Sequence, residues 1–77
     1  MLKRKIGDKV FINPYSDVTG VIIDSKEANS EFNPNWDYKV KFDKPVSYGF
    51  GPVEAEYFND VELDKLLSNW NAIKGIK

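Results

Sequence analysis

The chain of 77 residues contains no cysteine and no histidine. Without cysteine it cannot form a disulfide or use a thiol nucleophile, and without histidine it lacks the usual zinc ligands and the base of imidazole-dependent triads. Its 11 Lys and Arg residues and 12 Asp and Glu residues give a net charge of −1 at pH 7. This balance argues against a nucleic-acid-binding protein that is basic over its whole surface.

Long hydrophobic runs are also missing from the sequence. No apolar segment approaches the length that crosses a membrane, and Gly7, Asp8 and Lys9 interrupt the stretch that follows the basic start. The absence of cysteine fits a reducing compartment. We therefore expect a cytoplasmic protein with no membrane segment, and residues 1–77 have the length of a single domain.

Aromatic residues, in contrast, are plentiful, with five Phe, four Tyr and two Trp. A small domain without disulfides or structural metals has to be stabilised by packed side chains or by association. Large rings bury the most area per residue, so they are expected to supply much of the core. Rings that fall in loops are candidates for binding a partner.

Four segments show the pattern of β-strands. The clearest one covers residues 36–43, where Trp36, Tyr38, Val40 and Phe42 alternate with charged residues, which predicts a half-buried antiparallel strand. Residues 10–12, 20–24 and 53–57 are further predicted strands, rich in β-branched or alternating apolar residues. Residues 25–35 and 43–52, with their Asn, Pro and Gly content, are expected to be long loops.

The C-terminal part of the chain carries two competing patterns. Residues 60–63 suggest a short fifth strand, and from there onward apolar residues follow helical spacing, namely Leu63, Leu66, Leu67, Trp70 and Ile73. We expect a strand near 60–63 and a helix over about 65–74, begun by Asn59 with Glu62 or by Asp64 alone and ended by Gly75. This helix is expected to close one end of the sheet structure. Alternatively it could serve as a ligand for a groove or as the seam of a weak homodimer.

The layout of these segments resembles that of SH3-like β-barrels in small bacterial and phage proteins. The resemblance is carried by the segments 6–12, 20–22, 38–42, 57–58 and 61–63, and Gly7-Asp8-Lys9-Val10 with Gly20-Val21 is also distantly similar to a KOW motif. It implies a mainly β fold, a five-stranded antiparallel barrel over about residues 5–64 followed by a short C-terminal α-helix. It also implies a phage or bacterial accessory protein.

No residue constellation in the sequence suggests an enzyme. Asp24, Glu27 and Glu31 lie near one loop, and Glu54 and Glu56 share one strand face, but neither set has apolar surroundings that would tune it for acid–base catalysis. Residues 49–52 lack the Lys-Ser/Thr of a phosphate-binding loop. We therefore expect a non-catalytic protein without a metal or a cofactor.

Aromatic residues in the predicted loops are the first candidate binding site. Flat rings lose little entropy on binding and are common in interfaces. The sequence therefore predicts a binding module that contacts another protein, with the candidate residues Tyr15, Trp36, Tyr48 and Phe50. In the alternative interpretation these rings, together with Phe32, fold back and plug the ends of the barrel.

A second hypothesis is a contact with nucleic acid through basic residues. The candidates for phosphate contacts are Lys3, Arg4 and Lys5 at the start of the chain and Lys39 and Lys41 on one strand face. Residues 54–64 carry only acidic charges, which oppose this contact unless they lie on the far side of the fold.

Overall fold

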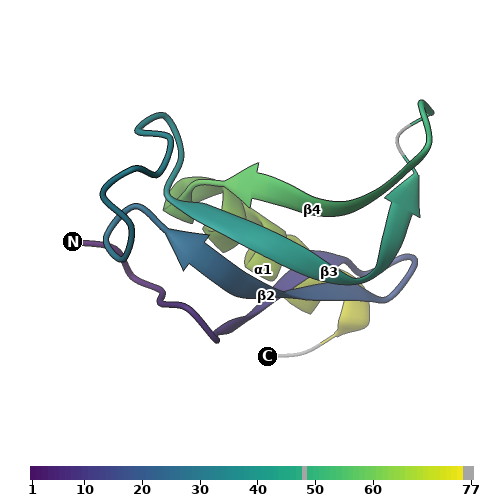
Figure 1. Cartoon of the computed structure of the whole chain (residues 1–77). Coiled ribbons are helices and arrows are strands. Elements are labelled where there is room, and N and C mark those ends of the chain that lie inside the picture. The colour runs from purple at the N-terminus through teal and green to yellow at the C-terminus, as the bar shows by residue number, and fades with distance from the viewer. Residues whose placement is uncertain (48, 76–77) are drawn as a thin grey trace.

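The computed structural model describes residues 1–47 and 49–75. These residues form the strands β1 (Lys9–Asn13), β2 (Val18–Ser25), β3 (Tyr38–Ser47) and β4 (Pro52–Phe58) and the helix α1 (Asp60–Lys74). The strands make one antiparallel sheet in the order β1-β2-β3-β4 (Figure 1). The prediction of a mainly β chain with a C-terminal helix is confirmed. In the described residues the sheet is open, with β1 and β4 at its edges.

The prediction of a fifth strand near residues 60–63 is wrong, because these residues form the first turn of α1. Asn59 precedes the helix, and its backbone amide donates to Glu62 Oε1 at 2.9 Å. The amide of Asp60 donates to Asp37 Oδ2 at 2.8 Å, so two amides at the helix start have carboxylate partners. Acidic side chains in the first turn also suit the positive end of the helix dipole. These interactions, one within the helix start and one with Asp37, favour a helix over the strand that would have closed a barrel.

Strand β3 is longer than the sequence suggested. Residues 43–47 were expected in a loop, but β3 continues through them to Ser47 and pairs with the start of β4. Its register with β4 is irregular between Lys41 and Val46. Pro45 lies in this stretch and has no amide hydrogen to donate to a neighbouring strand, which accounts for part of the irregularity.

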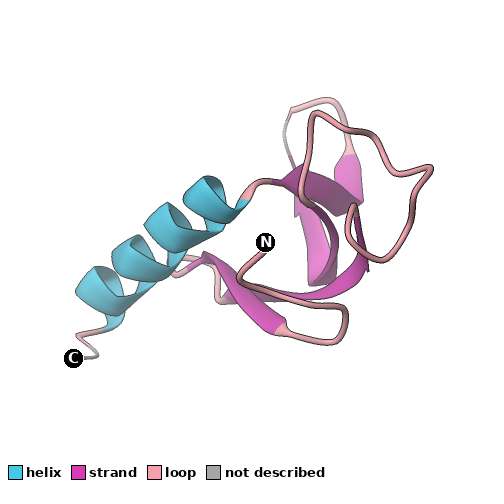
Figure 2. Ribbon diagram, turned by 90° about the vertical axis from the view of Figure 1, so that its left-hand side faces the viewer, coloured by secondary structure: helices cyan, strands magenta, loops and turns pink. Residues whose placement is uncertain are grey.

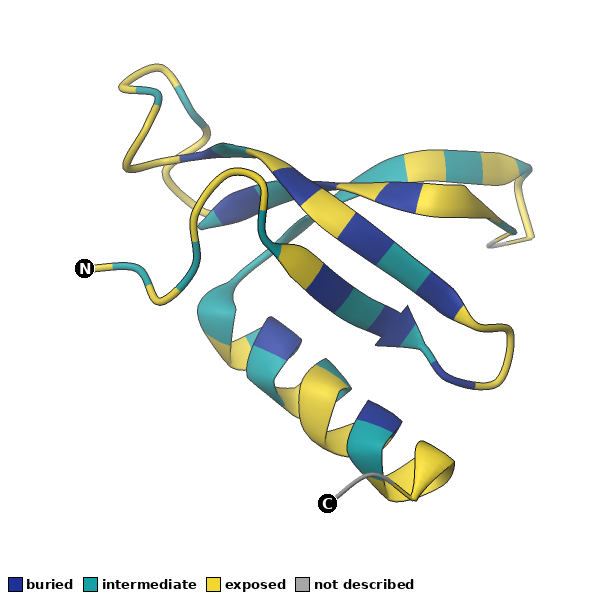
Figure 3. Ribbon diagram, turned by 90° about the horizontal axis from the view of Figure 1, so that it is seen from below, coloured by how far each residue is buried: buried dark blue, intermediate teal, exposed yellow. Residues whose placement is uncertain are grey.

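The core lies on the face of the sheet that we call the inner face. Tyr38, Val40 and Phe42 project onto it at alternate positions of β3 and are buried, as their spacing predicted. They pack with residues from the other elements, namely Val10, Ile12, Ile22 and Leu63. Figure 3 shows the resulting alternation of buried and exposed positions along the strands.

Helix α1 packs against β1, at one side of the strongly curved sheet (Figure 2). Leu63 and Trp70 are its buried residues, and the Trp70 ring lies 5.0 Å from the Phe11 ring. The helix ends at Gly75, as predicted. Gly75 has a left-handed backbone conformation with φ of 73°, and its amide donates a hydrogen bond to the carbonyl of Asn71. Within the described residues, no helix has both the length and the apolar character needed to cross a membrane.

Candidate functional site

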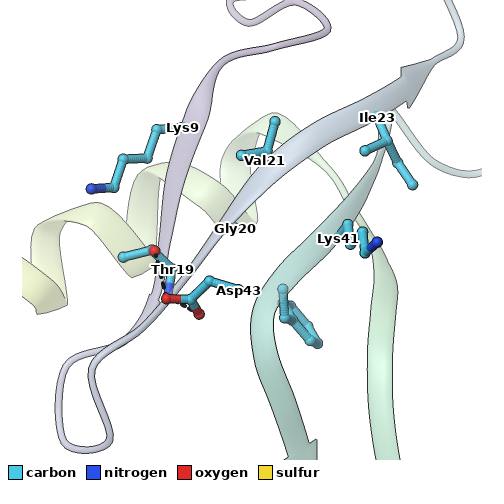
Figure 4. Close-up of a pocket in the computed structure, with 8 residues that line it drawn as sticks. Lys9, Thr19, Gly20, Val21, Ile23, Lys41 and Asp43 are labelled. Atoms are coloured by element: carbon cyan, nitrogen blue, oxygen red, sulfur yellow. Dashed lines mark hydrogen bonds between the residues drawn. The ribbon is translucent and has the colours of Figure 1, made fainter.

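The face of the sheet opposite the core, which we call the outer face, gathers lysines and apolar side chains. Strand register places Lys9, Val21, Lys41 and Ala55 side by side in one row across all four strands. The neighbouring row on the same face pairs Lys39 with Tyr57. In the close-up of Figure 4 the helix passes behind the strands. At the β1 edge, however, Phe11 lies on the same side of the strand as Lys9 and its ring contacts Trp70 of α1. The Lys9 ammonium lies 5.6 Å from the centre of the Phe11 ring.

An apolar groove of about 240 Å³ lies on the outer face. Val21 and Ile23 are 44% and 43% exposed there, although both are aliphatic. Lys9 on β1 and Lys41 on β3 stand on either side of Val21 (Figure 4). At one end of the groove Asp43 accepts hydrogen bonds from the amide and the hydroxyl of Thr19 at 3.1 and 3.2 Å.

Three half-buried rings form a cluster beside this groove, at the end of the sheet where β3 begins. The Tyr57 ring lies 5.6 Å from that of Phe32 and 6.3 Å from that of Trp36. The ammonium of Lys39 sits 5.8 Å from the centre of the Tyr57 ring. We call Phe32, Trp36 and Tyr57 the ring cluster. Because Tyr57 is on the outer face, Trp36 does not share the core-facing side of Tyr38 that its spacing suggested.

The lysines of the outer face are not neutralised by ion pairs. Across residues 1–47 and 49–75, none of Lys9, Lys39 and Lys41 forms a salt bridge. The two carboxylates near them are already hydrogen-bonded: Asp43 accepts from Thr19, and Asp24 accepts from the Ser25 amide and from Asn29. None of the three ammonium groups is therefore held by a carboxylate among the described residues.

Most of the acidic C-terminal stretch lies away from this face. Glu56 is the register partner of the fully buried Val40, so it belongs to the inner face of the edge strand β4. Asp60 and Asp64 lie in the first turns of α1. The fold thus places these acidic side chains apart from the lysines of the outer face, although the net charge of the sequence is close to zero.

The basic N-terminus is engaged by the acids of α1. Lys3 Nζ lies 2.7 Å from Asp64 Oδ2. Arg4 donates through its two terminal nitrogens to Asp60 at 2.8 Å and to Asp64 at 2.9 Å. Lys3 and Arg4 are thus drawn to the helix, and the structure does not join them with Lys39 and Lys41 in one patch. Lys5 is exposed.

A buried polar network anchors this N-terminal segment to the core. The Tyr38 hydroxyl donates to Asp60 Oδ1 at 2.6 Å and accepts from the Arg4 amide at 2.8 Å. Burial and the bond to Asp60 raise the pKa of Tyr38 well above its ordinary value. Burial alone would raise the pKa of Asp60, but hydrogen bonds from Tyr38, the Lys3 amide and Arg4 outweigh it and lower that pKa. The network therefore holds Asp60 charged and Tyr38 neutral.

The loop rings predicted as one partner-binding surface are not brought together. Tyr15 lies in the β1–β2 turn and Phe50 in the β3–β4 turn, both at one end of the sheet, and they are 75% and 81% exposed. Trp36 lies in the β2–β3 loop at the opposite end (Figure 1). Tyr48 lies outside the described residues.

Several residues of the outer face were not singled out from the sequence, namely Lys9, Val21, Ile23 and Tyr57. Tyr57 alternates with Glu54 and Glu56, which is the usual mark of a core-facing residue. The usable signal was Phe58, which interrupts that alternation. Its ring lies 6.3 Å from that of the core residue Phe42, so Phe58 is on the inner face and its neighbour Tyr57 is not.

Within the described part of the chain, no group of three or more acidic side chains is placed to hold a metal ion. No family model matches the sequence, and comparisons with curated proteins and with solved structures give no significant match.

Proposed function

We propose that this protein is a non-catalytic binding module and that its outer face contacts an extended anionic partner. The observation that carries the proposal is the placement of Lys9 on β1 and of Lys39 and Lys41 on β3, all on one face of the sheet and without ion pairs among the described residues. Lys39 and Lys41 follow each other along β3, and Lys9 shares the row of Lys41 two strands away, which is about 10 Å, so the three charges are spread over the face rather than forming a compact pocket. This arrangement suits a chain-like ligand.

The apolar side chains between the lysines support the same role. Val21 and Ile23 line an apolar groove between the lysines and are 44% and 43% exposed, so a ligand on this face can bury them. Contacts of this kind add affinity to the long-range attraction that the lysines exert.

The test is retention of the full-length protein on a polyanion, with immobilised heparin and poly-glutamate as probes. The whole chain is net negative at pH 7, so retention requires a local positive surface. We expect salt-sensitive retention that is lost in the combined variant Lys9→Gln, Lys39→Gln, Lys41→Gln. Lys65→Gln, which removes an exposed charge from α1, is the matched control and should elute with the unmodified protein. Absence of retention at low salt would rule the proposal out.

A contact with another protein through the loop rings is the second candidate function, supported by the exposure of Tyr15 and Phe50 at one end of the sheet. It predicts that Tyr15→Ala and Phe50→Ala abolish capture of a specific protein in pull-downs. Trp36→Ala, at the other end, should leave that capture intact. Loss of capture with the lysine variants instead would favour the outer face.

Kinship with SH3-like barrels remains a prediction. It is supported by the meander of four antiparallel strands over residues 9–58, and the helix at the position of the expected fifth strand is the point of departure.

A further inference from the structure

We infer that the anionic partner of the outer face is a single-stranded nucleic acid, an inference that rests on the proposed function above. The lysines alone would accept any polyanion, including an acidic segment of a protein. The ring cluster next to them provides the additional chemistry, because aromatic side chains stack with bases of any sequence.

The ring cluster is held in place before any ligand binds. Tyr57 projects from β4, and Phe32 and Trp36 reach it from the β2–β3 loop. That loop is closed at its base by an ion pair of 2.8 Å between Lys26 and Asp37 and by the bond from the Lys26 amide to the Asp37 carbonyl. Rings that are already positioned lose little further freedom when a base stacks on them.

Positive charge and the ring cluster lie next to each other on this face. Lys39 lies above Tyr57, and Lys41 follows two residues along β3 in the direction of the groove. A strand whose base rests on the ring cluster would therefore meet Lys39 and then Lys41 with its adjoining phosphates, and its path would continue over Val21 toward Lys9.

Duplexes and acidic peptides fit this surface less well. In a duplex the bases are stacked on each other and their faces are closed to Tyr57 and Trp36, so only the phosphates remain for contact. A glutamate-rich peptide can pair with the lysines but has no flat group for the rings. The geometry therefore favours an unpaired strand over both alternatives.

The experiment compares four fluorescent probes of matched charge with the full-length protein: single-stranded poly(dT), the same strand with abasic sites, a duplex and poly-glutamate. Binding is followed by anisotropy at low salt and by quenching of Trp fluorescence. We expect poly(dT) to bind about tenfold more tightly than the abasic strand, the amount that one stacked base supplies. Quenching should occur with poly(dT) only.

Variants separate the two parts of the surface. Trp36→Leu and Tyr57→Leu should reduce binding of poly(dT) about tenfold and leave binding of the abasic strand unchanged. Lys41→Gln should weaken binding of all four probes, and Lys65→Gln should weaken none. Thermal melting of each variant establishes that it is folded, and Trp36→Leu, which changes a loop residue, provides the test if Tyr57→Leu does not fold.

The results distinguish this inference from the proposal beneath it. If the abasic strand and poly-glutamate bind as tightly as poly(dT), the single-strand inference is overturned, while the anionic contact surface stands. If none of the four probes binds at low salt, both are overturned.

Discussion

Gly20 lies in β2 directly across from Phe42, at a point where the backbone of β3 approaches closely. A β-carbon added at this position would lie 2.6 Å from Val40 Cγ1 and 2.9 Å from the carbonyl oxygen of Lys41. The carbonyl belongs to the strand ladder and cannot turn aside. The glycine is therefore required by space between two strands, not by an unusual backbone angle.

Replacing Gly20 with alanine should lower the free energy of unfolding by about 1–3 kcal/mol, because the added methyl forces β2 and β3 apart. Chemical denaturation measures this change. Val21→Ala at the next, exposed position is the control and should have a smaller effect. If the Gly20→Ala variant were as stable as the unmodified protein, this would contradict the close approach of β2 and β3 at Gly20.

Asp60 is the residue that links three parts of the chain, since Tyr38, Arg4 and the Lys3 amide all donate to it. Its folded-state pKa lies below the ordinary value of 3.8. A carboxyl with a lowered pKa stabilises the fold above its ordinary pKa, and this contribution disappears as the pH falls through the folded value.

We therefore expect Asp60→Asn to lose about 2 kcal/mol or more of stability at pH 7, because buried donors lose their charged acceptor. The difference from the unmodified protein should begin to narrow below about pH 4, where Asp60 of the unfolded chain takes up a proton, and should disappear as the pH falls through the lower folded-state pKa. Unfolding free energies measured from pH 7 to pH 3 test this. Glu31→Gln, in an exposed loop, is the control. A difference that stays constant over this range would contradict the role given to Asp60.

Among the elements, α1 depends most on contacts that are distant in sequence. Its start is tied to Asp37 before β3, its middle places Trp70 against Phe11 of β1, and its last turn pairs Lys74 with Asp17 in the β1–β2 turn. The helix stripe recognised in the sequence is only partly buried: Leu63 and Trp70 are enclosed, whereas Leu67 and Ile73 remain exposed.

Because some apolar residues of α1 are buried and others exposed, replacing them with alanine should lower the free energy of unfolding by different amounts. Trp70→Ala should cost about 3 kcal/mol or more, since it leaves a cavity beside Phe11. Ile73→Ala, one turn away and largely exposed, should cost less than about 1 kcal/mol. Denaturant titration compares the two variants directly. Equal losses would mean that the exposed side of α1 is covered in solution.

At the scale of the whole molecule, the fold sorts charges that are mixed along the chain. Lys3 and Arg4 are drawn to the acids of α1, and Lys9, Lys39 and Lys41 are left together on the outer face. A net charge near zero is therefore compatible with a locally positive surface.

The salt dependence of single-strand binding should report this arrangement. Each phosphate contact contributes about 0.7 to the slope of log affinity against log salt, so three lysines predict a slope of about −2. Lys41→Gln should reduce its magnitude by about 0.7, and Lys3→Gln should leave it unchanged because Lys3 is paired with Asp64. A slope that responds to Lys3 would show that the N-terminus joins the contact surface.

Much of the fold follows from local patterns. Period-two alternation predicted that Tyr38, Val40 and Phe42 face the core, and Gly75 marked the end of the helix. Asn59 with Glu62 was one of two predicted starts of that helix, and the structure has this one. The failures also have local causes. The first helical turn was assigned to a strand because Val61 and Leu63 alternate, and residues 43–47 were assigned to a loop because Pro45 and the glycines beyond it are common in turns.

The candidate site was less accessible to sequence analysis. Lys39 and Lys41 were correctly placed on one strand face, but their association with Lys9 and Tyr57 depends on strand register. Register is fixed by pairing between residues far apart in the chain, so it leaves no local mark at Lys9 or Tyr57.

The sequence by itself determined that four segments form strands, that a helix ends the chain at Gly75 and which side of β3 faces the core, because these depend on the periodicity and capping of neighbouring residues. Only the tertiary structure decided that Tyr15 and Trp36 lie at opposite ends of the sheet and that Arg4 pairs with Asp60. It alone also brought the ring cluster next to the lysines of the outer face. These relations join segments that are brought together only when the strands pair and the chain packs around its core, and the proposed binding surface is built from them.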